Sequence, residues 1–184
     1  MKDTNPLSTT LRTADVTPPF DLARTAAPVA WGRGRWPNTH WSEGALIWCG
    51  LENDVVVWRI VSQNGPATLR IEGPANPAAD RAWLSDTLGI DVGAPAFDDD
   101  RLRNLMDRHA GLRPFAHGSL WEGLAGSIVG QGVSVAGGAT LLSRIAALVH
   151  PGIALAGRTL WPMPEPAAIA ALGVDRLRGV GLTR

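Results

Sequence analysis

Two apolar segments joined by a short polar stretch occupy residues 119–150, and they constrain the fold more than any other part of the chain. The joint is Gly130-Gln-Gly-Val-Ser134. Apolar residues recur on both sides of it at spacings of three and four, which predicts two helices. The first helix carries two neighbouring apolar rows, Leu120, Leu124 and Ile128 in one and Trp121, Ala125 and Val129 in the other. A face this wide predicts a largely buried helix.

The ends of these helices carry capping and stop signals. Ser119 and Glu122 match a capping box, in which each residue satisfies a backbone donor at the helix start, so Glu122 is predicted to be structural. The second helix is predicted to end at Pro151-Gly152, and a short helix is predicted over 164–172. Gly137-Gly138 costs about 1 kcal/mol per glycine inside a helix. The pair therefore predicts either close helix packing or a close approach to DNA.

The first half of the chain has the alternation and the turn signals of β-strands. Apolar runs at 45–51 and 55–61 flank Asn53-Asp54, and residues 68–72 alternate, with Leu69 and Ile71 on one face. This pattern predicts an antiparallel meander with one face exposed to water. A first strand is predicted at 20–25. Residues 1–18, rich in Thr, Pro and Asp, are predicted to form a flexible N-terminus.

Two helices are predicted after the sheet, over 77–88 and 101–109. The residues predicted to face the core are Trp83, Leu84 and Leu88 in the first helix and Leu102, Leu105 and Met106 in the second. Three aspartates, 98–100, precede the second helix. Acidic residues at a helix start interact favourably with the positive end of its dipole, and this explanation is favoured over metal binding.

Charge is unevenly distributed although the chain is neutral overall. Residues 1–100 hold 8 basic and 13 acidic residues, whereas residues 101–184 hold 9 basic and 4 acidic residues. The basic second half predicts a nucleic-acid face. Composition drift between two domains explains the same counts equally well.

Several classes of protein are disfavoured by the sequence. The N-terminus lacks the apolar core of a secretory signal, and no apolar run approaches the roughly 20 residues of a membrane span, so a cytoplasmic protein is expected. Cys49 is the single cysteine, which excludes an intrachain disulfide and a cysteine-based metal site, and it is predicted to be a buried small hydrophobe. The four histidines have no metal-ligand spacing, so no metal site is expected.

Seven of the eight tryptophans fall into two groups. The four on predicted strands or apolar helix faces are assigned to the core, and they are Trp48, Trp58, Trp83 and Trp121. Trp31, Trp36 and Trp41 instead lie near Arg33 and Arg35 in a segment punctuated by Gly and Pro. This cluster has two interpretations, contact with a base or DNA and cation–π packing over the edge of the sheet.

The order of these segments resembles the 3-methyladenine DNA glycosylase II family, part of the helix-hairpin-helix DNA glycosylase superfamily. The resemblance covers most of the chain from about residue 18, and its most specific part is the core Ile-Val-Gly-Gln-x-Val-Ser of residues 128–134. The stretches that carry it are Pro19-Phe-Asp-Leu22, 107–114, 121–134 and 170–181. It implies an α+β chain with a flexible N-terminus (1–18), an antiparallel sheet with flanking helices (19–112) and the first part of an all-α glycosylase domain (113–184).

The resemblance also implies an activity, DNA base excision repair. Such enzymes hydrolyse the N-glycosidic bond of flipped alkylated bases in damaged double-stranded DNA, and they use no metal or organic cofactor. Because that bond is inaccessible in a stacked duplex, the nucleotide is extruded first. The resemblance implies that Gln131, Gly132, Val133 and Ser134 contact DNA. Gln131 offers donors and an acceptor to base edges, and backbone amides near Ser134 bind a phosphate.

Two features depart from the family pattern. Many members have a bulky wedge residue after the glutamine, where this chain has Gly132. The hairpin and the catalytic aspartate implied by the resemblance would follow Arg184, so no catalytic residue is assigned within the chain. Negligible turnover is therefore expected, since electrostatic stabilisation is typically the largest catalytic contribution. The apolar face of the helix at 119–131 would be exposed without the helices that normally cover it, which favours association or a partly molten state.

Three hypotheses follow from the sequence. The chain is a glycosylase whose catalytic segment is encoded elsewhere or lost, a non-catalytic DNA-binding or damage-sensing module, or a structural or interaction domain in which the acidic half dominates.

Overall fold

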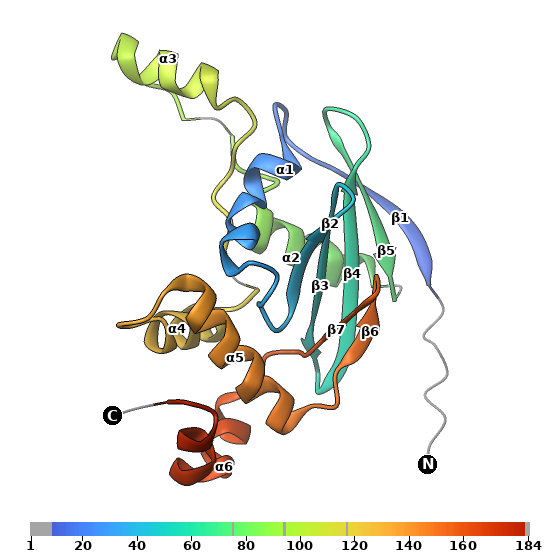
Figure 1. Ribbon diagram of the computed structural model, residues 1–184. Coiled ribbons are helices and arrows are strands. Elements are labelled where there is room, and N and C mark those ends of the chain that lie inside the picture. Colours follow the sequence, from blue (N-terminus) through green and yellow to red (C-terminus); the bar gives the residue numbers. More distant parts are fainter. Residues whose placement is uncertain (1–8, 75, 94, 117, 183–184) are drawn as a thin grey trace.

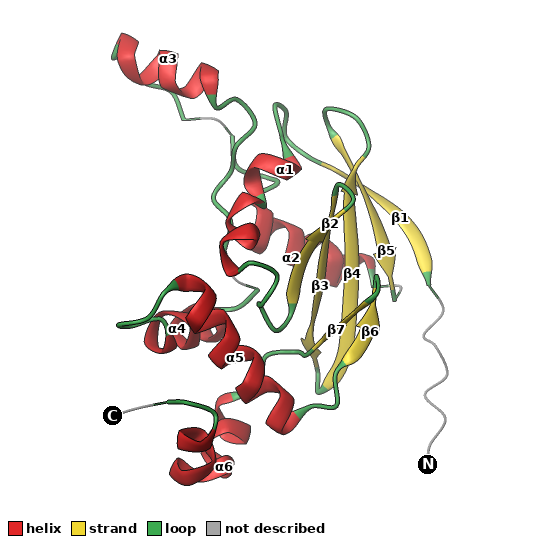
Figure 2. Cartoon of the chain, in the orientation of Figure 1, coloured by secondary structure: helices red, strands yellow, loops and turns green. Residues whose placement is uncertain are grey.

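The computed structural model describes residues 9–182 apart from 75, 94 and 117, and its first half is built around one antiparallel sheet (Figure 1). The strands are β1 (Thr10–Asp15), β2 (Thr39–Ser42), β3 (Ala45–Glu52), β4 (Val55–Gln63) and β5 (Thr68–Gly73), in the spatial order β1-β5-β4-β3-β2. Helices follow the sheet and flank it, as Figure 2 shows. The α+β class expected from the sequence is confirmed.

Two tight turns set the register of the central strands. Glu43-Gly44 joins β2 to β3 and Asn53-Asp54 joins β3 to β4, and all four residues have positive φ. Two-residue turns with positive φ at both positions match the twist of antiparallel strands. Ser42 consequently pairs with Ala45, and Glu52 pairs with Val55. The turn predicted at Asn53-Asp54 is confirmed.

Two expectations for the N-terminal region are wrong. Of the residues expected to be flexible, Thr10–Asp15 form β1, which pairs with β5 along its whole length from Thr10↔Gly73 to Asp15↔Thr68; residues 1–8 lie outside the described part. The strand predicted at 20–25 is instead the short helix α1 (Leu22–Thr25). Asp21 caps this helix by accepting a hydrogen bond from the Arg24 backbone at 2.9 Å, and capping of this kind favours a helical turn.

The main core lies between one face of the sheet and a layer made of α1, the 3₁₀ helix η1 (Ala27–Gly32) and α2 (Pro77–Leu88). The helix predicted at 77–88 is confirmed, with Gly89 at its C-terminal end in the left-handed conformation at φ 59°. The alternation of Leu69 and Ile71 is also confirmed, because both side chains are buried. The predicted inward residues of α2 are buried too, namely Trp83, Leu84 and Leu88.

The sequence predicted that the opposite face of the sheet is exposed to water. In the structure, that face is partly covered. A small hairpin, β6 (Ile153–Leu155) and β7 (Arg158–Leu160), packs over β3 and β4 (Figure 1). Leu160 forms a second buried cluster with Ile47 and Cys49, which confirms that Cys49 is buried. The Trp161 backbone N–H donates to the Pro37 carbonyl at 2.8 Å and ties the end of the hairpin to the segment before β2.

Three helices form the second part of the molecule, and they are α4 (Leu120–Val129), α5 (Val135–Val149) and α6 (Pro166–Gly179). α5 packs against both η1 and α4, and its buried face holds Gly138, Ala139, Leu142, Ile145 and Ala146. α6 is kinked at Gly173, where φ is 75°. None of the described helices is long and apolar enough to cross a membrane.

The helix α3 (Asp100–Arg108) contradicts the prediction that it packs inward. It projects away from the sheet and the other helices (Figure 1), and no residue in it is buried. Leu102 and Leu105 are among the exposed large hydrophobic residues. The structural role predicted for the aspartates is confirmed, since Asp99 caps the helix by accepting from the backbone N–H groups of Arg101 and Leu102.

α4 is less buried than its two apolar rows predict. Its inner row packs against α5 and the segment before α6, where Ala125 joins Leu142 and Met163 in a buried cluster with Trp121 and Val129 around it. The outer row is exposed, with Leu120 at 81%, Leu124 at 49% and Ile128 at 62%. The outer row therefore forms an exposed apolar face, and exposed faces of this kind promote association.

A buried charge cluster holds the sheet, α2 and the edge strand together. The Arg59 side chain on β4 is 2% exposed and donates from Nε to Asp80 Oδ1 at 2.9 Å. Asp80 on α2 accepts a second bond from Arg12 Nε on β1 at 2.6 Å, and Glu52 accepts from Arg59 Nη2 at 2.5 Å. The guanidinium of Arg59 also lies over the rings of Trp48 and Trp83, at 5.1 and 5.4 Å from their centroids.

Removing the shared carboxylate of this cluster is expected to be costly. In Asp80→Asn, the buried Arg59 and the largely buried Arg12 lose their common counter-charge, so unfolding should become easier by about 3–5 kcal/mol. The matched change Glu72→Gln removes the exposed pair with Arg70 and should cost less than about 1 kcal/mol. Urea titration followed by circular dichroism measures both, and equal effects of the two changes would contradict the importance of the cluster.

Candidate functional site

The loop between α4 and α5 is the part of the helical region that the sequence singled out, and the structure exposes it. Gln131, Gly132, Val133 and Ser134 are all exposed to solvent. Val133 is 44% exposed, so an apolar side chain stands at the tip of a polar loop. The loop therefore presents an amide, a hydroxyl and a small apolar group on one accessible turn.

Gly132 has a conformation that suits glycine. Its φ is +76°, and a Cβ added there would meet no atom within 4 Å. A larger residue therefore has space but would be strained, because side chains with a Cβ rarely adopt the left-handed region. The absence of a bulky residue after Gln131 is thus tied to the shape of this loop.

Ser134 begins α5 as its N-cap. Its side chain accepts from the Gly137 backbone N–H at 3.1 Å, and its carbonyl accepts from the Gly138 N–H at 2.8 Å. The first N–H groups of a helix lack partners within the helix and carry the positive end of its dipole. Gly138 is buried, with its Cβ position 3.4 Å from the Gly130 Cα. α5 therefore packs against the end of α4 at Gly138, although a Cβ there would make only ordinary van der Waals contact.

A cavity of about 370 Å³ lies beside the loop, between η1 and the start of α5. Aromatic and apolar side chains make most of its wall, and none of its described lining residues is charged. Among them are Trp31, Trp36, Phe115 and Val135. Trp31 is exposed, whereas Trp36 is half-buried and donates from Nε1 to the Val29 carbonyl at 3.1 Å. The tryptophan cluster noted in the sequence is therefore divided, since Trp36 and Trp41 pack against the main core and Trp31 is exposed.

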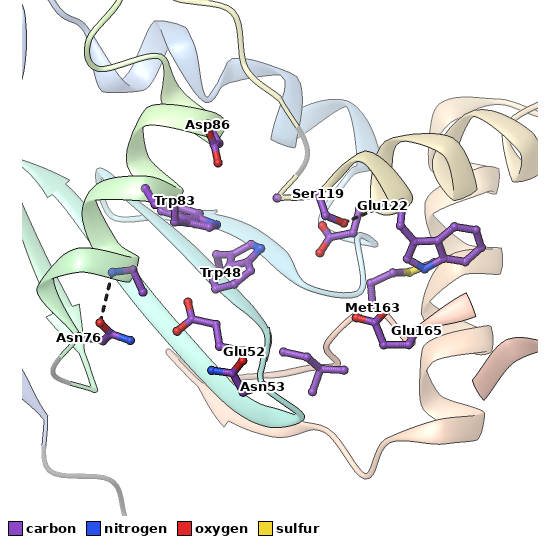
Figure 3. Close-up of a pocket in the computed structure, with 15 residues that line it drawn as sticks. Trp48, Glu52, Asn53, Asn76, Trp83, Asp86, Ser119, Glu122, Met163 and Glu165 are labelled. Atoms are coloured by element: carbon purple, nitrogen blue, oxygen red, sulfur yellow. Dashed lines mark hydrogen bonds between the residues drawn. The ribbon is translucent and has the colours of Figure 1, made fainter. Parts of the chain in front are cut away.

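A second cavity, of about 380 Å³, lies at the opposite end of α4 (Figure 3). Trp48 and Trp83 pack side by side there, with ring centroids 5.0 Å apart, and both are buried as predicted. Glu122 extends from the first turn of α4 toward Trp48, as the close-up shows. Asp86 and Glu165 also line this cavity, so its described charged residues are all acidic.

Glu122 performs a different structural task from the one its sequence pattern predicted. Ser119 accepts from the Glu122 backbone N–H at 3.1 Å, which is half of the capping box. The Glu122 carboxylate instead accepts from Asn38 Nδ2 at 3.0 Å and so connects α4 to the segment before β2. Burial raises the pKa of Glu122, and Glu165 acts in the same direction, whereas the hydrogen bonds from Asn38 and Gly118 oppose the shift.

The remaining reactive side chains supply no second site. Burial raises the pKa of the Cys49 thiol, and the negative charge of Glu122 raises it further, so Cys49 stays protonated and unreactive. Within the described residues, no group of three or more His, Cys, Asp or Glu side chains is placed to hold a metal ion. The sequence analysis missed the acidic cavity, because its residues are spread over four segments of the chain and no local pattern joins them.

The raised pKa of the half-buried Glu122 carboxyl predicts a pH-dependent stability. Its pKa is raised above the ordinary 4.5 in the folded state, so the folded chain holds a proton that the unfolded chain releases. The stabilising effect is complete below pH 4.5 and is lost as the pH rises through the folded-state pKa. Glu122→Gln keeps an acceptor for Asn38 but cannot ionise, so its stability relative to wild type should increase from pH 4 to pH 8.

Urea titrations of both proteins across this range measure the difference, with Glu43→Gln at an exposed turn as the control. A relative stability that does not change with pH, or that falls as the pH rises, would show that Glu122 is charged without penalty in the fold.

Solved structures of DNA glycosylases share this architecture. The 3-methyladenine DNA glycosylase from Archaeoglobus fulgidus superposes with a TM-score of 0.80 at 20% sequence identity, over 94% of this chain and 62% of that one. MBOgg1 in complex with a low-affinity DNA ligand gives a TM-score of 0.67 at 18% identity, over 94% and 57%. The Clostridium acetobutylicum 8-oxoguanine glycosylase/lyase in its apo form gives 0.66 at 14% identity, over 94% and 58%.

No protein-family model matches the sequence, and no curated protein matches it. The chain spans about three fifths of the length of the glycosylase structures. At these identities the likeness is one of fold. Over 94% of its length, the chain has the fold of these DNA glycosylases.

Proposed function

We propose that this chain is the DNA-contacting part of a base excision repair glycosylase, and that the loop from Gln131 to Ser134 enters the duplex at a lesion. The observation that carries the proposal is an exposed polar loop at the start of a long helix, on a glycosylase fold. Gln131 supplies two donors and an acceptor to base edges. The first turn of α5 supplies backbone N–H groups to a phosphate.

A base leaving the stack vacates space that a protein side chain must fill. Gly132 has no side chain, and a larger residue at its φ of +76° would be strained. Val133 follows directly in the loop and is 44% exposed. We therefore assign the filling role to Val133, supported by Gln131 on the other side of the glycine.

The uncharged aromatic cavity beside the loop is suited to hold the extruded base. Its walls include Trp31, Trp36 and Phe115, and Val135 connects it to the loop. Aromatic rings stack on any base, at about 1–3 kcal/mol per base. They also attract cationic groups, and alkylated purines can carry a positive charge. Together with the likeness to the A. fulgidus 3-methyladenine enzyme, this favours alkylated bases as the lesion class.

Hydrolysis of the glycosidic bond needs a carboxylate close to the sugar. None of the described residues that line the cavity beside the loop is acidic, and Glu122 and Glu165 line the other cavity. This favours binding without turnover by these 184 residues. A non-catalytic damage-sensing module is the second candidate, and the same observation supports it. Both roles require contact with DNA. In a cell without a nucleus, DNA lies in the cytoplasm, so both roles are compatible with a cytoplasmic protein.

Binding to an abasic site tests the loop directly. The chain should bind a duplex with one abasic site more tightly than the intact duplex, and Gln131→Ala should reduce this preference about tenfold, the order expected for one or two lost hydrogen bonds. Asn104→Ala, a matched amide change on the projecting helix α3, should leave the preference unchanged. Fluorescence anisotropy with labelled duplexes measures the ratio. Equal, weak binding to both duplexes would count against the proposal.

Base release tests the catalytic half of the proposal. The 184-residue chain should release no alkylated base above background from methylated duplex DNA, because the cavity beside the loop offers no carboxylate to stabilise the cationic sugar. Mass spectrometry of the free bases measures the release. Robust release by the purified chain, unaffected by metal chelators, would refute this expectation and would require a catalytic acid among the residues present.

A further inference from the structure

A third cavity, of about 440 Å³, lies between α5, the segment that links η1 to β2, and the β6–β7 hairpin. Three arginines from these three segments line it, and they are Arg35, Arg144 and Arg158. Three hydroxyl groups, those of Thr140, Ser143 and Thr159, line it as well. No acidic residue is found among its described lining residues. We call this cavity the arginine cleft.

Side-chain contacts link the three segments that carry these arginines. Arg158 reaches back over Gly34, donating from Nη2 to the Gly34 carbonyl, and a Cβ at position 34 would lie 2.5 Å from Arg158 Nη1. The absence of a side chain at Gly34 therefore makes room for Arg158 beside Arg35. Arg35 in turn lies 3.5 Å from the hydroxyl of Thr140, one turn before Arg144 on α5.

The positive charge in the arginine cleft is not neutralised by the described residues. Arg35, Arg144 and Arg158 form no ion pair among the described residues, whereas Arg12, Arg59 and five other arginines pair with carboxylates. Arg144 donates to the Val180 carbonyl at 3.1 Å, and Arg158 donates to the Gly34 carbonyl and to His40 Nδ1 at 3.2 Å, so all of these acceptors are neutral. Burial lowers the pKa of His40 and the charge of Arg158 lowers it further, which favours the neutral imidazole that accepts from Arg158.

The three arginines are exposed, so solvent screens their mutual repulsion, and an anion between them would be attracted by all three. Guanidinium groups match the geometry of phosphate oxygens and bind them through paired hydrogen bonds. Thr159 supplies a further hydroxyl on the same wall, whereas the hydroxyls of Thr140 and Ser143 already donate to the Ala136 and Arg35 carbonyls. The geometry therefore points to a phosphate group as the ligand: we propose that the arginine cleft is a phosphate-binding site separate from the Gln131–Ser134 loop.

The phosphate has two sources with the same chemistry. A free phosphoester, such as a nucleoside monophosphate, would place its base against Trp36 or Trp161, which also line the cleft. A phosphate of the DNA backbone would instead extend the contact made at the loop, which begins the same helix. Only this second source rests on the proposed function, and the first stands without it.

Calorimetric titration with inorganic phosphate and with AMP tests the first source. Salt-dependent binding of an intact duplex tests the second. Arg35→Gln, Arg144→Gln and Arg158→Gln should each weaken the bound phosphate roughly tenfold, the order expected for one charge-assisted hydrogen bond. For DNA, each change should also reduce the salt slope by about one. Arg101→Gln removes the same charge from the projecting helix α3 and should change neither quantity.

The outcomes distinguish a free phosphoester from a DNA phosphate, and they distinguish the proposal for the cleft from the proposal for the loop. Loss of phosphate and AMP binding in the cleft variants identifies a free phosphoester site, and loss confined to DNA identifies a backbone contact. Arg158→Lys retains the positive charge but loses the two parallel donors of the guanidinium. An affinity between those of wild type and Arg158→Gln would therefore support paired hydrogen bonding. Gln131→Ala should leave phosphate binding intact, which keeps a failure at the loop distinct from a failure at the cleft. Unchanged binding of all ligands in the folded triple variant R35Q/R144Q/R158Q would overturn the proposal.

Discussion

The buried guanidinium of Arg59 is the constraint on which the arrangement of the first half depends. A charge that is 2% exposed is tolerated only with counter-charges and hydrogen bonds around it, because desolvation costs several kcal/mol. Asp80 and Glu52 supply these counter-charges, one from α2 and one from β3. Trp48 and Trp83 stack around the same group. The position of α2 against the sheet, and with it the floor of the acidic cavity, therefore follows from one side chain.

The distribution of charge in space differs from the distribution along the chain. The sequence divides into an acidic first half and a basic second half, but the cavities mix the two. Glu122 and Glu165 come from the second half and line the acidic cavity, whereas Arg35 comes from the first half and lines the arginine cleft. The fold thus gathers acidic residues around one cavity and basic residues around another. An anionic ligand is therefore repelled at the acidic cavity, at one end of α4, and attracted to the arginine cleft along α5. A count of charges per segment predicts that such asymmetry exists, but not where it lies.

Local signals in the sequence predicted the structure well wherever the decisive contacts lie within a few residues. Asn53-Asp54 forms its turn, Ser119 caps α4, and Pro77–Leu88 is a helix with Gly89 at its end. The errors concern contacts over long separations. β1 is a strand because β5 offers it a pairing edge about 60 residues away, and its own composition gives no sign of this. The β6–β7 hairpin was missed for a related reason, since strands of three residues with Ala156-Gly157 between them lack the usual turn residues.

Amphipathic patterns in helices proved correct about helix formation and incomplete about burial. α3 and the outer row of α4 have the periodicity of packed helices, yet Leu102, Leu105 and Leu120 are exposed. A pattern records which face can be buried and contains no information about the surface that buries it. The same limit applies to the candidate site. The Gln131–Ser134 segment is recognisable because it is contiguous, whereas the arginine cleft joins residues more than 100 positions apart and has no sequence signature.

The helix α5 holds the loop and the arginine cleft at a fixed distance from each other. Five residues on its inner face are buried against η1 and α4, which fixes its position relative to the sheet. Ser134 at its start and Arg144 two to three turns later are therefore held at a fixed separation of about 15 Å. A rigid spacing of this kind lets one bound duplex engage both places without the entropy cost of ordering a flexible linker. It also restricts which duplexes fit, because a helix cannot shorten to follow a bent backbone. If one duplex occupies both places, the loop and the cleft therefore bind DNA at two points a fixed distance apart. If a free phosphoester fills the cleft, they are independent sites.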